Sequence, residues 1–509
     1  MDVTVVGSGY VGLVSAAGLA HAGHRVRAVD ADPGRIEMLR RGVLPFVEPG
    51  LPEIISDEIA ASRLTFELDG EAAIAAGEVI LVAVGTHDGN GGWQTDSLAN
   101  CLTSVARHAR AGAVIAIRST VPPDRLDSLA THAAASRAEA GGTPLPVVLN
   151  PEFTREGSAL RDFLGPDRIV IGAVDDPSGR GVARMRELYD GFRAPILTMS
   201  GRDACMAKLG SNLFLATKIS FANELARLCD RFGARVDQVV NVMALDPRIG
   251  GAFLRPGVGF GGSCLPNQVA MTVRSFTEAG EDLPLLAAVD RINHQQRLRC
   301  VDLLDDLVGG LPGRRIALFG LTFKPGTDDL RDAPALEIAA ALIRRGATVI
   351  ATDPMPPARA RAADLVPGLM AVADPREAAT GADAVALVTE WPELCALDWR
   401  EIAGLLRGKV VLDGRNALDP DAIIGAGLTY AAFGRGVGRP EPEMAGAETV
   451  RDRVVRITPP RRRGPLSPQA RHHRVATASS GATAPWRPGS RSSPTGATAA
   501  IPAQENFDG

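Results

Sequence analysis

The residue with the clearest capacity for chemistry is a cysteine that follows a glycine-rich stretch. Residues 257–262 hold four glycines in six positions, and Ser263 and Cys264 come directly after them. A backbone with so few side chains can lie against a ligand. Pro266 favours a helix that begins just after Cys264, and a thiol at a helix N-terminus has a lowered pKa and a larger thiolate fraction. A buried structural cysteine is the alternative, which we assume for the other five; for Cys264 the glycine stretch favours a nucleophile.

Four polar side chains elsewhere could assist such a nucleophile. Lys208 and Asn212 are four residues apart in a helical pattern, so they share one face, where an ammonium and a carboxamide can stabilise an oxyanion. A solvated helix face is the alternative for this pair. Glu152 follows an apolar run at 147–149 and could act as a general base at the sheet edge where α/β folds bind ligands. Thr120 follows another such run and offers a hydroxyl at the same edge.

A second motif predicts a dinucleotide site. Residues 7–12 form GxGxxG between a predicted strand and a predicted helix, where glycines allow a tight turn and a close approach to a pyrophosphate. Asp30 ends the second predicted strand, and a carboxylate there accepts hydrogen bonds from ribose hydroxyls and repels a 2′-phosphate, which favours NAD over NADP. Arg35 could lie near the adenine or the ribose, although a surface arginine is the simpler interpretation. The predicted cofactor residues of this segment are Gly7, Gly9, Tyr10, Val11, Gly12, Asp30 and Arg35.

The elements that must position these residues alternate between strands and helices. Apolar runs separated by helical patterns lie at 3–6, 25–30, 80–84, 114–117, 147–149 and 169–171. They predict a parallel, doubly wound sheet. The pattern is helical between 201 and 300, and strand candidates return at 315–319, 348–352, 384–389 and 410–412. The predicted fold class is therefore α/β, with two Rossmann-like doubly wound parallel-sheet domains joined by a helical central segment.

These patterns divide the chain into four parts. We expect an NAD-binding domain over 1–200, a central helical segment over 201–300, a C-terminal domain over 301–437 and a tail over 438–509. The end of the chain is rich in Pro, Arg, Ser, Ala and Thr and has little apolar periodicity. Such a segment cannot bury enough apolar surface to offset its ordering entropy, so we expect a disordered tail. A solvated tail is favoured over one that binds an anionic partner.

Composition limits the class of protein. The chain has 509 residues and a net charge of −4, which gives no reason to expect a nucleic-acid or membrane partner. No secretory signal precedes the first strand, and no apolar run reaches the ~18 residues of a membrane-spanning helix. Six scattered cysteines, without a CxxC pair or a nearby His, fit a reducing compartment and give no sign of a zinc site. We expect a cytoplasmic enzyme with no bound metal.

Eight motifs in order give the chain a resemblance to the UDP-glucose/GDP-mannose dehydrogenase family. They are GSGYVG at 7–12, STVP at 119–122, NPEFTREG at 150–157, KLGSNLFLATKISFANELA at 208–226, DPRIG at 246–250, GVGFGGSC at 257–264, FKPGTDDLRDAP at 323–334 and DGRN at 413–416. The resemblance runs from Met1 to about Gly436. Any one motif is a weak signal, whereas eight in the same order are not expected by chance.

The resemblance implies an NAD-dependent enzyme that oxidises C6 of a nucleotide sugar twice. A first hydride leaves C6 for NAD⁺ and gives an aldehyde, to which the Cys264 thiolate adds. A second hydride leaves for a second NAD⁺, and the resulting thioester is hydrolysed to a uronate. Ser263 and the DPRIG motif look most like members of the family that act on UDP-glucose. The resemblance also implies a C-terminal domain for the nucleotide sugar and a central dimerisation segment, hence a homodimer.

The resemblance assigns roles to further residues by position. Glu152 and Thr120 would handle protons and water, and Lys208 with Asn212 would stabilise the oxyanions. Besides the turn residues, the predicted cofactor contacts are Thr86, Thr120, Glu156 and Arg331. The predicted substrate contacts are Glu152, Phe153, Lys208, Asn212, Arg248, Phe253, Leu254, Gly261, Phe323 and Lys324, with Arg248 reaching the sugar across a dimer interface.

The chain departs from the family pattern at two places. Val84-Gly85-Thr86 replaces the usual Thr-Pro-Thr after a strand of the cofactor domain, and Asn267 and Gln268 replace a Lys-Asp pair after the cysteine. That Asp is thought to assist the cysteine or the hydrolytic water; Gln cannot act as a base, and losing one proton-handling group can cost ~10²–10⁴ in rate. Two alternatives therefore stay open. They are a dehydrogenase of another nucleotide sugar, such as GDP-mannose, and a catalytically impaired nucleotide-sugar-binding protein.

Overall fold

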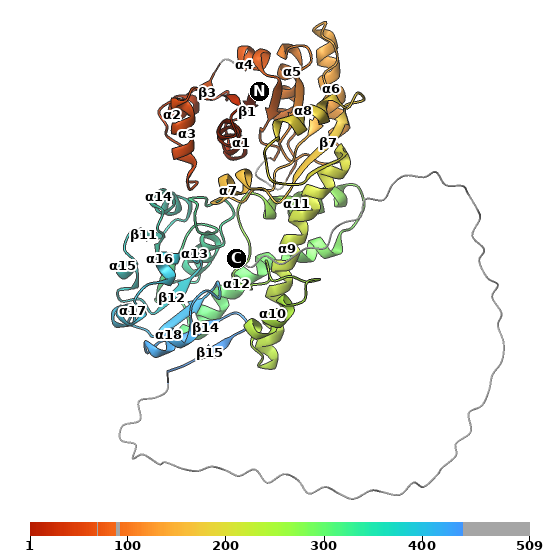
Figure 1. The fold of residues 1–509 in the computed structure, drawn as a ribbon. Coiled ribbons are helices and arrows are strands. Elements are labelled where there is room, and N and C mark those ends of the chain that lie inside the picture. The colour runs from red at the N-terminus through yellow and green to blue at the C-terminus, as the bar shows by residue number, and fades with distance from the viewer. Residues whose placement is uncertain (69, 88–91, 441–509) are drawn as a thin grey trace, which may run out of the picture. The chain divides into compact units, whose positions relative to one another are not determined.

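The computed structural model describes residues 1–68, 70–87 and 92–440 (Figure 1). Within these residues the chain forms two α/β sheets connected by long helices, which confirms the predicted fold class. The predicted disordered tail over 438–509 lies outside the described residues except for 438–440. None of the helices in the described ranges combines the length and apolar character that a membrane-spanning segment needs.

The first sheet has eight strands in the order β3-β2-β1-β4-β5-β6-β7-β8. Its strands are β1 (Asp2–Val6), β2 (Arg25–Val29), β3 (Leu64–Glu67), β4 (Val79–Val82), β5 (Val114–Ile117), β6 (Val147–Leu149), β7 (Ile169–Asp175) and β8 (Ile196–Ser200). The strands from β3 to β6 run parallel in the doubly wound order that dinucleotide-binding sheets adopt. Every residue of β4 and β5 is buried, as expected for central parallel strands that are covered by helices on both faces.

The direction of β7 differs from the prediction. The run at 169–171 is a strand, but it pairs antiparallel with β6, and β8 then pairs parallel with β7. The connection from β6 to β7 holds only the short helix α7 (Ala159–Leu164) and begins beyond the carboxyl end of β6. The chain therefore re-enters the sheet from the edge that it has just left. A parallel pair would have needed a crossover to the opposite edge.

Helices cover this sheet. They are α1 (Tyr10–His21), α2 (Pro33–Arg40), α3 (Leu51–Ala60), α4 (Gly70–Ala76), α5 (Asp96–His108), α6 (Leu126–Glu139), α7 and α8 (Arg180–Leu188). Small residues allow α1 to pack closely, because a Cβ on Gly18 would lie 2.2 Å from the ring of Phe163. The middle of α1, from Gly12 to Ala20, is buried for this reason.

Four helices follow the first sheet: α9 (Gly201–Phe232), α10 (Val236–Ala244), α11 (Leu265–Glu278) and α12 (Pro284–Val308). The helical pattern predicted between 201 and 300 is present, and α12 continues to Val308. Ser200 caps the start of α9 by accepting a hydrogen bond from the Asp203 N–H. Gly233 ends α9 in the left-handed conformation with φ +67°, which a glycine adopts without strain.

The second sheet has the order β11-β10-β9-β12-β13-β14-β15. Its strands are β9 (Arg315–Phe319), β10 (Thr348–Thr352), β11 (Met370–Val372), β12 (Ala384–Leu387), β13 (Val410–Asp413), β14 (Thr429–Ala432) and β15 (Gly436–Gly438). Its helices are α13 (Pro334–Arg344), α14 (Pro356–Leu365), α15 (Pro375–Ala379), α16 (Pro392–Cys395), α17 (Trp399–Leu405) and α18 (Pro420–Gly425). The strands from β11 to β14 repeat the doubly wound order, and β15 adds one antiparallel strand.

The glycine-rich loop, residues 257–262, is held by two of the long helices. Asn223 of α9 accepts a hydrogen bond from the first N–H of this loop at 2.8 Å. Asn293 of α12 pairs with both backbone groups of Phe260: its Oδ1 accepts from the N–H at 2.8 Å, and its Nδ2 donates to the carbonyl at 3.0 Å. Arg297, one turn further along α12, donates to the same carbonyl at 2.9 Å. All three side chains are buried, so the loop has little freedom to move.

Replacing Asn293 with leucine should lower the free energy of unfolding by roughly 1–3 kcal/mol, because the buried N–H of Phe260 loses its partner while the carbonyl keeps its hydrogen bond from Arg297. Gln295→Leu, at an exposed position of the same helix, is the matched control and should change the value by no more than about 0.5 kcal/mol. Urea unfolding compares the two variants. Equal midpoints would mean that Asn293 does not hold the loop.

Candidate active site

Ten of the predicted site residues line one cavity of about 930 Å³. They are Glu152, Phe153, Glu156, Lys208, Asn212, Phe253, Gly261, Cys264, Phe323 and Lys324. The wall combines the loop after β6, the helix α9, the glycine-rich loop with the start of α11, and loops that follow β9, β12 and β13. The carboxyl edges of both sheets therefore contribute to a single space, whose volume suits a small organic ligand.

Cys264 is the N-cap residue of α11, as the sequence predicts, and its side chain is exposed into the cavity. Ser263 Oγ lies 3.7 Å from its Sγ. The expected fall in the pKa of this thiol is wrong. Although the sulfur is reachable, protein atoms surround it and this desolvation raises the pKa; Glu152 and Glu156 raise it further, and Lys208 lowers it. Burial and the charges around the cavity therefore outweigh the helix N-terminus.

Lys208 and Glu152 form a buried ion pair on the cavity wall. The Nζ of Lys208 lies 2.8 Å from Oε1 of Glu152, and the two side chains are only 5% and 8% exposed. The other oxygen of Glu152 accepts hydrogen bonds from the N–H and the hydroxyl of Thr154 at 2.7 and 2.8 Å. Burial acts to raise the pKa of Glu152, but Lys208 and Thr154 hold it below its usual range. The burial of Lys208 excludes a solvated helix face, and Glu152 is ionised at neutral pH.

The two residues that depart from the family pattern lie on the first turn of α11. Gln268 is buried, and its Oε1 accepts a hydrogen bond from Nδ2 of Asn212 at 2.9 Å. Asn267 turns back and donates to the Ser263 carbonyl at 2.9 Å. Gln268 therefore supplies a hydrogen-bond acceptor that orients the Asn212 side chain, which a carboxylate at this position would also do. Unlike a carboxylate, Gln268 carries no negative charge and cannot act as a base.

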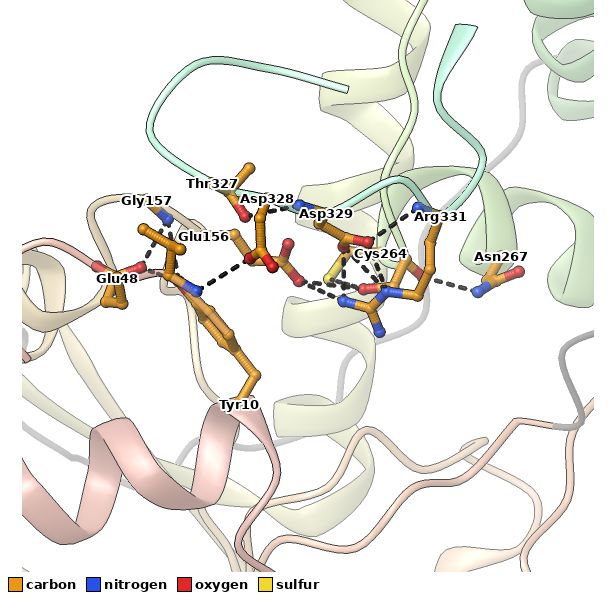
Figure 2. A network of polar contacts seen from close by, with 12 residues as sticks. Tyr10, Glu48, Glu156, Gly157, Cys264, Asn267, Thr327, Asp328, Asp329 and Arg331 are labelled. Carbon is orange, nitrogen blue, oxygen red and sulfur yellow. Dashed lines mark hydrogen bonds and ion pairs between the residues drawn. The ribbon is translucent and has the colours of Figure 1, made fainter. Parts of the chain in front are cut away.

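Figure 2 shows a network of polar contacts beside the cavity, where the loop after β6 meets the loop after β9. Asp329 binds the guanidinium of Arg331 through contacts of 2.7 to 3.0 Å, and Arg331 also lies 3.0 Å from Oε1 of Glu156. Ser263 donates to the same oxygen at 3.3 Å. Burial and the adjacent Asp329 carboxyl raise the pKa of Glu156 to about 7, against the positive charges of Arg331 and Lys324. Glu156 is therefore the carboxyl of this pair that takes up a proton near neutral pH, whereas Arg331 holds the pKa of Asp329 below its usual range.

Tyr10, a predicted cofactor contact, belongs to the same network by its side chain (Figure 2). Its hydroxyl donates to Glu48 and accepts from the Gly157 N–H at 3.0 Å. One residue before Glu48, the Val47 N–H donates to Asp328 of the loop after β9 at 2.9 Å. The phenol therefore helps to join the first helix to the loops beneath the cavity. A cofactor contact by this residue would involve its backbone.

The GxGxxG turn has the geometry that the motif predicts. Gly7 has φ +98°, and a Cβ there would lie 2.6 Å from the carbonyl oxygen of Ala83. A Cβ on Gly12 would lie 1.8 Å from the Gly7 carbonyl oxygen, whereas a Cβ on Gly9 would meet no described atom within 4 Å. Gly9 is the N-cap of α1 and provides no side-chain cap. Open space in front of uncapped N–H groups is what a pyrophosphate requires, so these residues fit a dinucleotide.

The carboxylate predicted to bind the ribose lies beside this turn. Asp30 accepts a hydrogen bond from the Ser8 N–H at 2.8 Å, and Arg35 lies 3.2 Å from the same oxygen. Arg35 is therefore ion-paired at the predicted ribose position rather than a free surface charge. Thr86 and Thr120 are joined at the same sheet edge, where the Thr86 hydroxyl donates to the Thr120 carbonyl at 2.6 Å.

Besides the residues of the GxGxxG turn and Asp30, Arg35, Thr86 and Thr120, three further predicted residues do not line the cavity. Arg248 is 87% exposed on the loop after α10, where it pairs with Asp246 at 2.6 Å. Leu254 is buried in the interior at 2% exposure. Arg331 reaches Glu156 but does not line the cavity. A contact between Arg248 and the sugar would thus need a second copy of the chain, as the resemblance implies.

The glycines after Pro256 have a role that the sequence interpretation did not include. A Cβ on Gly259 would lie 2.5 Å from Asn293 Oδ1, and a Cβ on Gly262 would lie 2.8 Å from the ring of Phe323. The expectation that these glycines open the backbone to a ligand is therefore incomplete. They also let the loop pack against α12 and against the loop that follows β9.

Arg415 is a cavity residue to which the sequence analysis gave no role. Its Nη1 donates to the Gly259 carbonyl at 3.1 Å and its Nη2 to the Phe323 carbonyl at 3.0 Å. It thereby connects the glycine-rich loop with the second sheet while its guanidinium borders the cavity. The DGRN motif contains this residue, but the motif alone gave no partner for it. Ser263 was likewise noted only as a marker of substrate class, and its hydroxyl lies between Cys264 and Glu156.

Comparison with protein families identifies three consecutive segments. The NAD binding domain of the UDP-glucose/GDP-mannose dehydrogenase family matches residues 1–193, its central domain matches residues 202–295, and its UDP binding domain matches residues 317–420. The segment that carries the GxGxxG turn is thus an NAD binding domain.

Similar proteins extend over most of the chain. A UDP-glucose 6-dehydrogenase of Pseudomonas aeruginosa is 39% identical over 456 residues, which cover 86% of this chain and 98% of the relative. The UDP-glucose 6-dehydrogenase YwqF of Bacillus subtilis is 37% identical over 440 residues, with coverage of 86% and 98%. Among solved structures, a UDP-glucose dehydrogenase from Pyrobaculum islandicum matches with a TM-score of 0.75 at 39% identity, covering 82% of this chain and 94% of that one. A UDP-D-ManNAc dehydrogenase from Pyrococcus horikoshii has the same TM-score at 25% identity, covering 86% and 100%.

Two alanine substitutions in the turn should have separable effects. Gly9→Ala should weaken NAD⁺ binding by about tenfold or more, equivalent to about 1.4 kcal/mol, because its methyl group enters the space that the pyrophosphate needs. Its thermal midpoint should stay unchanged because the methyl group meets no described atom within 4 Å. Gly12→Ala should lower the midpoint, since its Cβ overlaps the Gly7 carbonyl. Calorimetric titration and thermal unfolding measure the two effects; normal NAD⁺ affinity in Gly9→Ala would contradict this location of the pyrophosphate.

Proposed function

Because this chain belongs to the UDP-glucose/GDP-mannose dehydrogenase family, we propose that it oxidises C6 of UDP-glucose twice, with NAD⁺ as hydride acceptor, to form UDP-glucuronate. The observation that carries the proposal is the arrangement of Cys264, Lys208, Glu152 and Asn212 around one cavity. UDP-glucose is favoured as the substrate because the relatives at 37% and 39% identity carry that name. The domain that matches the family's UDP binding domain supports a nucleotide sugar.

The first oxidation needs stabilisation of a negatively charged oxygen at C6. NAD⁺, when bound at the glycine turn, supplies the hydride acceptor. In this proposal the C6 hydroxyl loses its proton to solvent water, and the ammonium of Lys208 stabilises the alkoxide that forms as the hydride leaves C6. Glu152 fixes the position of the Lys208 ammonium, because the two side chains form a buried ion pair with a contact of 2.8 Å. An ammonium preorganised in this way stabilises developing charge without reorganising during the reaction.

The second oxidation makes use of the cysteine. The Cys264 sulfur adds to the aldehyde carbon, and the oxyanion that forms is stabilised by Lys208 and by the carboxamide of Asn212. Loss of the second hydride leaves a thioester on Cys264. Attack by water releases the uronate and one proton to solvent, and it restores the thiol of Cys264. Covalent attachment keeps the aldehyde in the site between the two oxidations.

Positive charge from the second sheet suits the diphosphate of a nucleotide sugar. Lys324 and Arg415 come from the second sheet, and both border the cavity. Burial lowers the pKa of Lys324, and a nearby anion would raise it again. Phe323 beside it offers an aromatic face for a base or a sugar.

A second candidate function rests on Gln268. If the hydrolysis of the thioester needs a carboxylate at this position, the chain would oxidise one sugar per active site and then stay acylated. The protein would then act as a binding protein or a single-turnover enzyme. The hydrogen bond from Asn212 to Gln268 shows that the side chain occupies the place of an acceptor, which favours an intact oxyanion site in either case.

NADH formation distinguishes these functions. With UDP-glucose and excess NAD⁺, continuous turnover with two NADH per sugar is expected, and GDP-mannose and UDP-ManNAc should react at least about tenfold more slowly. A burst that stops after one turnover per site, and that Gln268→Asp converts into continuous turnover, would establish the second candidate. Asn267→Lys is the control because it restores the other family residue without a carboxylate. Absence of NADH with all three sugars would refute both functions.

We also propose that the chain forms a homodimer through α9 and α10. Phe214, Phe221 and Leu228 are spaced by seven residues on α9 and are 63%, 48% and 55% exposed. Leu245 at the end of α10 is 85% exposed, and Arg248 follows three residues later. A stripe of exposed apolar side chains such as the one on α9 marks a protein interface more often than a solvated surface. In a dimer, Arg248 could contribute to the cavity of the other copy.

Sedimentation equilibrium tests the dimer. The wild-type chain should sediment as a dimer, and the double variant Phe221→Asp/Leu228→Asp should be a monomer, because two buried carboxylates in an apolar interface are strongly unfavourable. Leu365→Asp, at an exposed apolar position on α14, is the control and should stay dimeric. A monomeric wild type, or a dimeric double variant, would show that this stripe is not the interface.

A further inference from the structure

A hydrogen-bonded path leads from the reactive thiol to a carboxyl group that the proposed reaction does not yet use. The Sγ of Cys264 and the Oγ of Ser263 are 3.7 Å apart, and either atom can be the donor. The Ser263 hydroxyl is 3.3 Å from Oε1 of Glu156. All three residues border the cavity. Figure 2 shows Glu156 and Cys264 close together in this network.

We propose that Ser263 and Glu156 form a proton relay that removes the thiol proton of Cys264 when its sulfur attacks the substrate aldehyde. The inference rests on the proposed function for the identity of the aldehyde. The S–H bond breaks and its proton passes to Ser263 Oγ, while the hydroxyl proton of Ser263 passes to Oε1 of Glu156. The sulfur forms a bond to C6, and the carbonyl π electrons move to the oxygen, where Lys208 stabilises them. No oxidant or reductant takes part in this step.

The relay is needed because the thiol is protonated at neutral pH. Desolvation raises the pKa of Cys264 above its ordinary value, so few thiolates are present before substrate binds. Gln268 cannot accept a proton, and Lys208 is held by Glu152. A base in contact with the thiol, directly or through one hydroxyl, is therefore required for fast addition.

Glu156 suits this role better than Glu152, although both line the cavity. Both oxygens of Glu152 are engaged, and its pKa is held below the usual range, so it is a weak base. The pKa of Glu156 is raised to about 7 by burial and by Asp329, which matches a group that gains and loses a proton at neutral pH. When two carboxyls in one site have opposite pKa shifts, one typically stays charged and stabilises a cation, and the other typically transfers protons.

The charged groups around Glu156 permit this proton transfer. Asp329, Arg331 and Lys324 face it from the second sheet, Cys264 faces it from the start of α11, and Tyr10 faces it from α1. Arg331 stays bound to Asp329 by several contacts, so protonation of Glu156 does not leave the guanidinium without a partner. Oε2 of Glu156 is buried and has no hydrogen-bond partner among the described residues. Glu156 can thus take up the proton on Oε1 without losing a hydrogen bond at Oε2.

Alkylation of Cys264 tests the relay without any nucleotide sugar. Iodoacetamide modification at pH 7.5 is followed by mass spectrometry of the peptide that contains Cys264. The relay predicts that Glu156→Gln and Ser263→Ala slow the modification by up to about 10²-fold, the usual contribution of a positioned base. If Glu156 acts only through its charge, which raises the pKa of the thiol, Glu156→Gln should instead accelerate the modification. The sign of the change therefore decides between the two roles, and acceleration would overturn the relay.

Controls separate the relay from a loss of structure. Ser158→Ala removes a hydroxyl two residues after Glu156, one that bonds to Arg155 and Asp162, and should leave the alkylation rate unchanged. Ser263→Thr keeps a hydroxyl next to the sulfur and should recover the rate that Ser263→Ala loses. Slow modification in Ser158→Ala, or no recovery in Ser263→Thr, would mean that the effect comes from the fold of the loop and would overturn the relay.

The pH dependence of turnover provides a second readout. Glu156 must be ionised to accept a proton, so kcat at saturating NAD⁺ should fall as the pH drops through about 7. Glu156→Gln and Ser263→Ala should lower kcat by about 10²-fold and remove this acid limb, while the KM of Ser263→Ala for NAD⁺ stays unchanged. An acid limb that persists in Ser263→Ala would contradict the relay. If UDP-glucose is not a substrate, the alkylation result still stands, so failure of the substrate assignment is distinguishable from failure of the relay.

Discussion

The structure depends on one steric constraint, the close packing of the loop at 257–262 between α12 and the second sheet. A side chain at Gly259 or Gly262 would overlap Asn293 or Phe323, so hydrogen is the largest substituent that fits. Because the loop is fixed on both sides, the cysteine that follows it has a defined position at the start of α11. The same packing brings the carboxyl edges of two sheets to a single cavity.

The electrostatics of the cavity follow from this packing. Burial raises the pKa of each carboxyl and thiol, and the partners then determine which group carries charge at neutral pH. Lys208 keeps Glu152 ionised, whereas Glu156 has Asp329 beside it and takes up a proton near pH 7. One carboxyl is thereby suited to hold a cation in place, and the other is suited to exchange protons. The chain obtains both functions from one short loop after β6.

Much of this arrangement could be predicted because the signals are local. The GxGxxG turn, Asp30 at the end of β2, the helical spacing of α9 and the helix start after Cys264 each follow from a few neighbouring residues. Strands missed by the sequence analysis, such as β8 and β11, are short or have exposed faces, so their apolar pattern is weak. The ion pair of Arg35 and the burial of Lys208 could not be predicted in this way, because each depends on which residues lie next to the side chain in the folded chain.

Properties that depend on distant residues could not be predicted. The direction of β7 depends on where the connection at 150–168 lies, and the pKa of Cys264 depends on carboxyls from the loop after β6. Gln268 looked like the loss of a base, whereas its contact with Asn212 shows that it keeps the acceptor. The packing role of Gly259 becomes apparent only with α12 in place.

The covalent role of Cys264 is tested most directly by an acid-quenched single turnover with enzyme in excess over UDP-glucose and with NAD⁺ present. Mass spectrometry of the digested protein should find a transient adduct of the oxidised nucleotide sugar on the peptide that contains Cys264, and the adduct should decay as free UDP-glucuronate appears. Complete conversion to UDP-glucuronate with no adduct on Cys264 at any time point, or with the adduct on another cysteine, would contradict the mechanism.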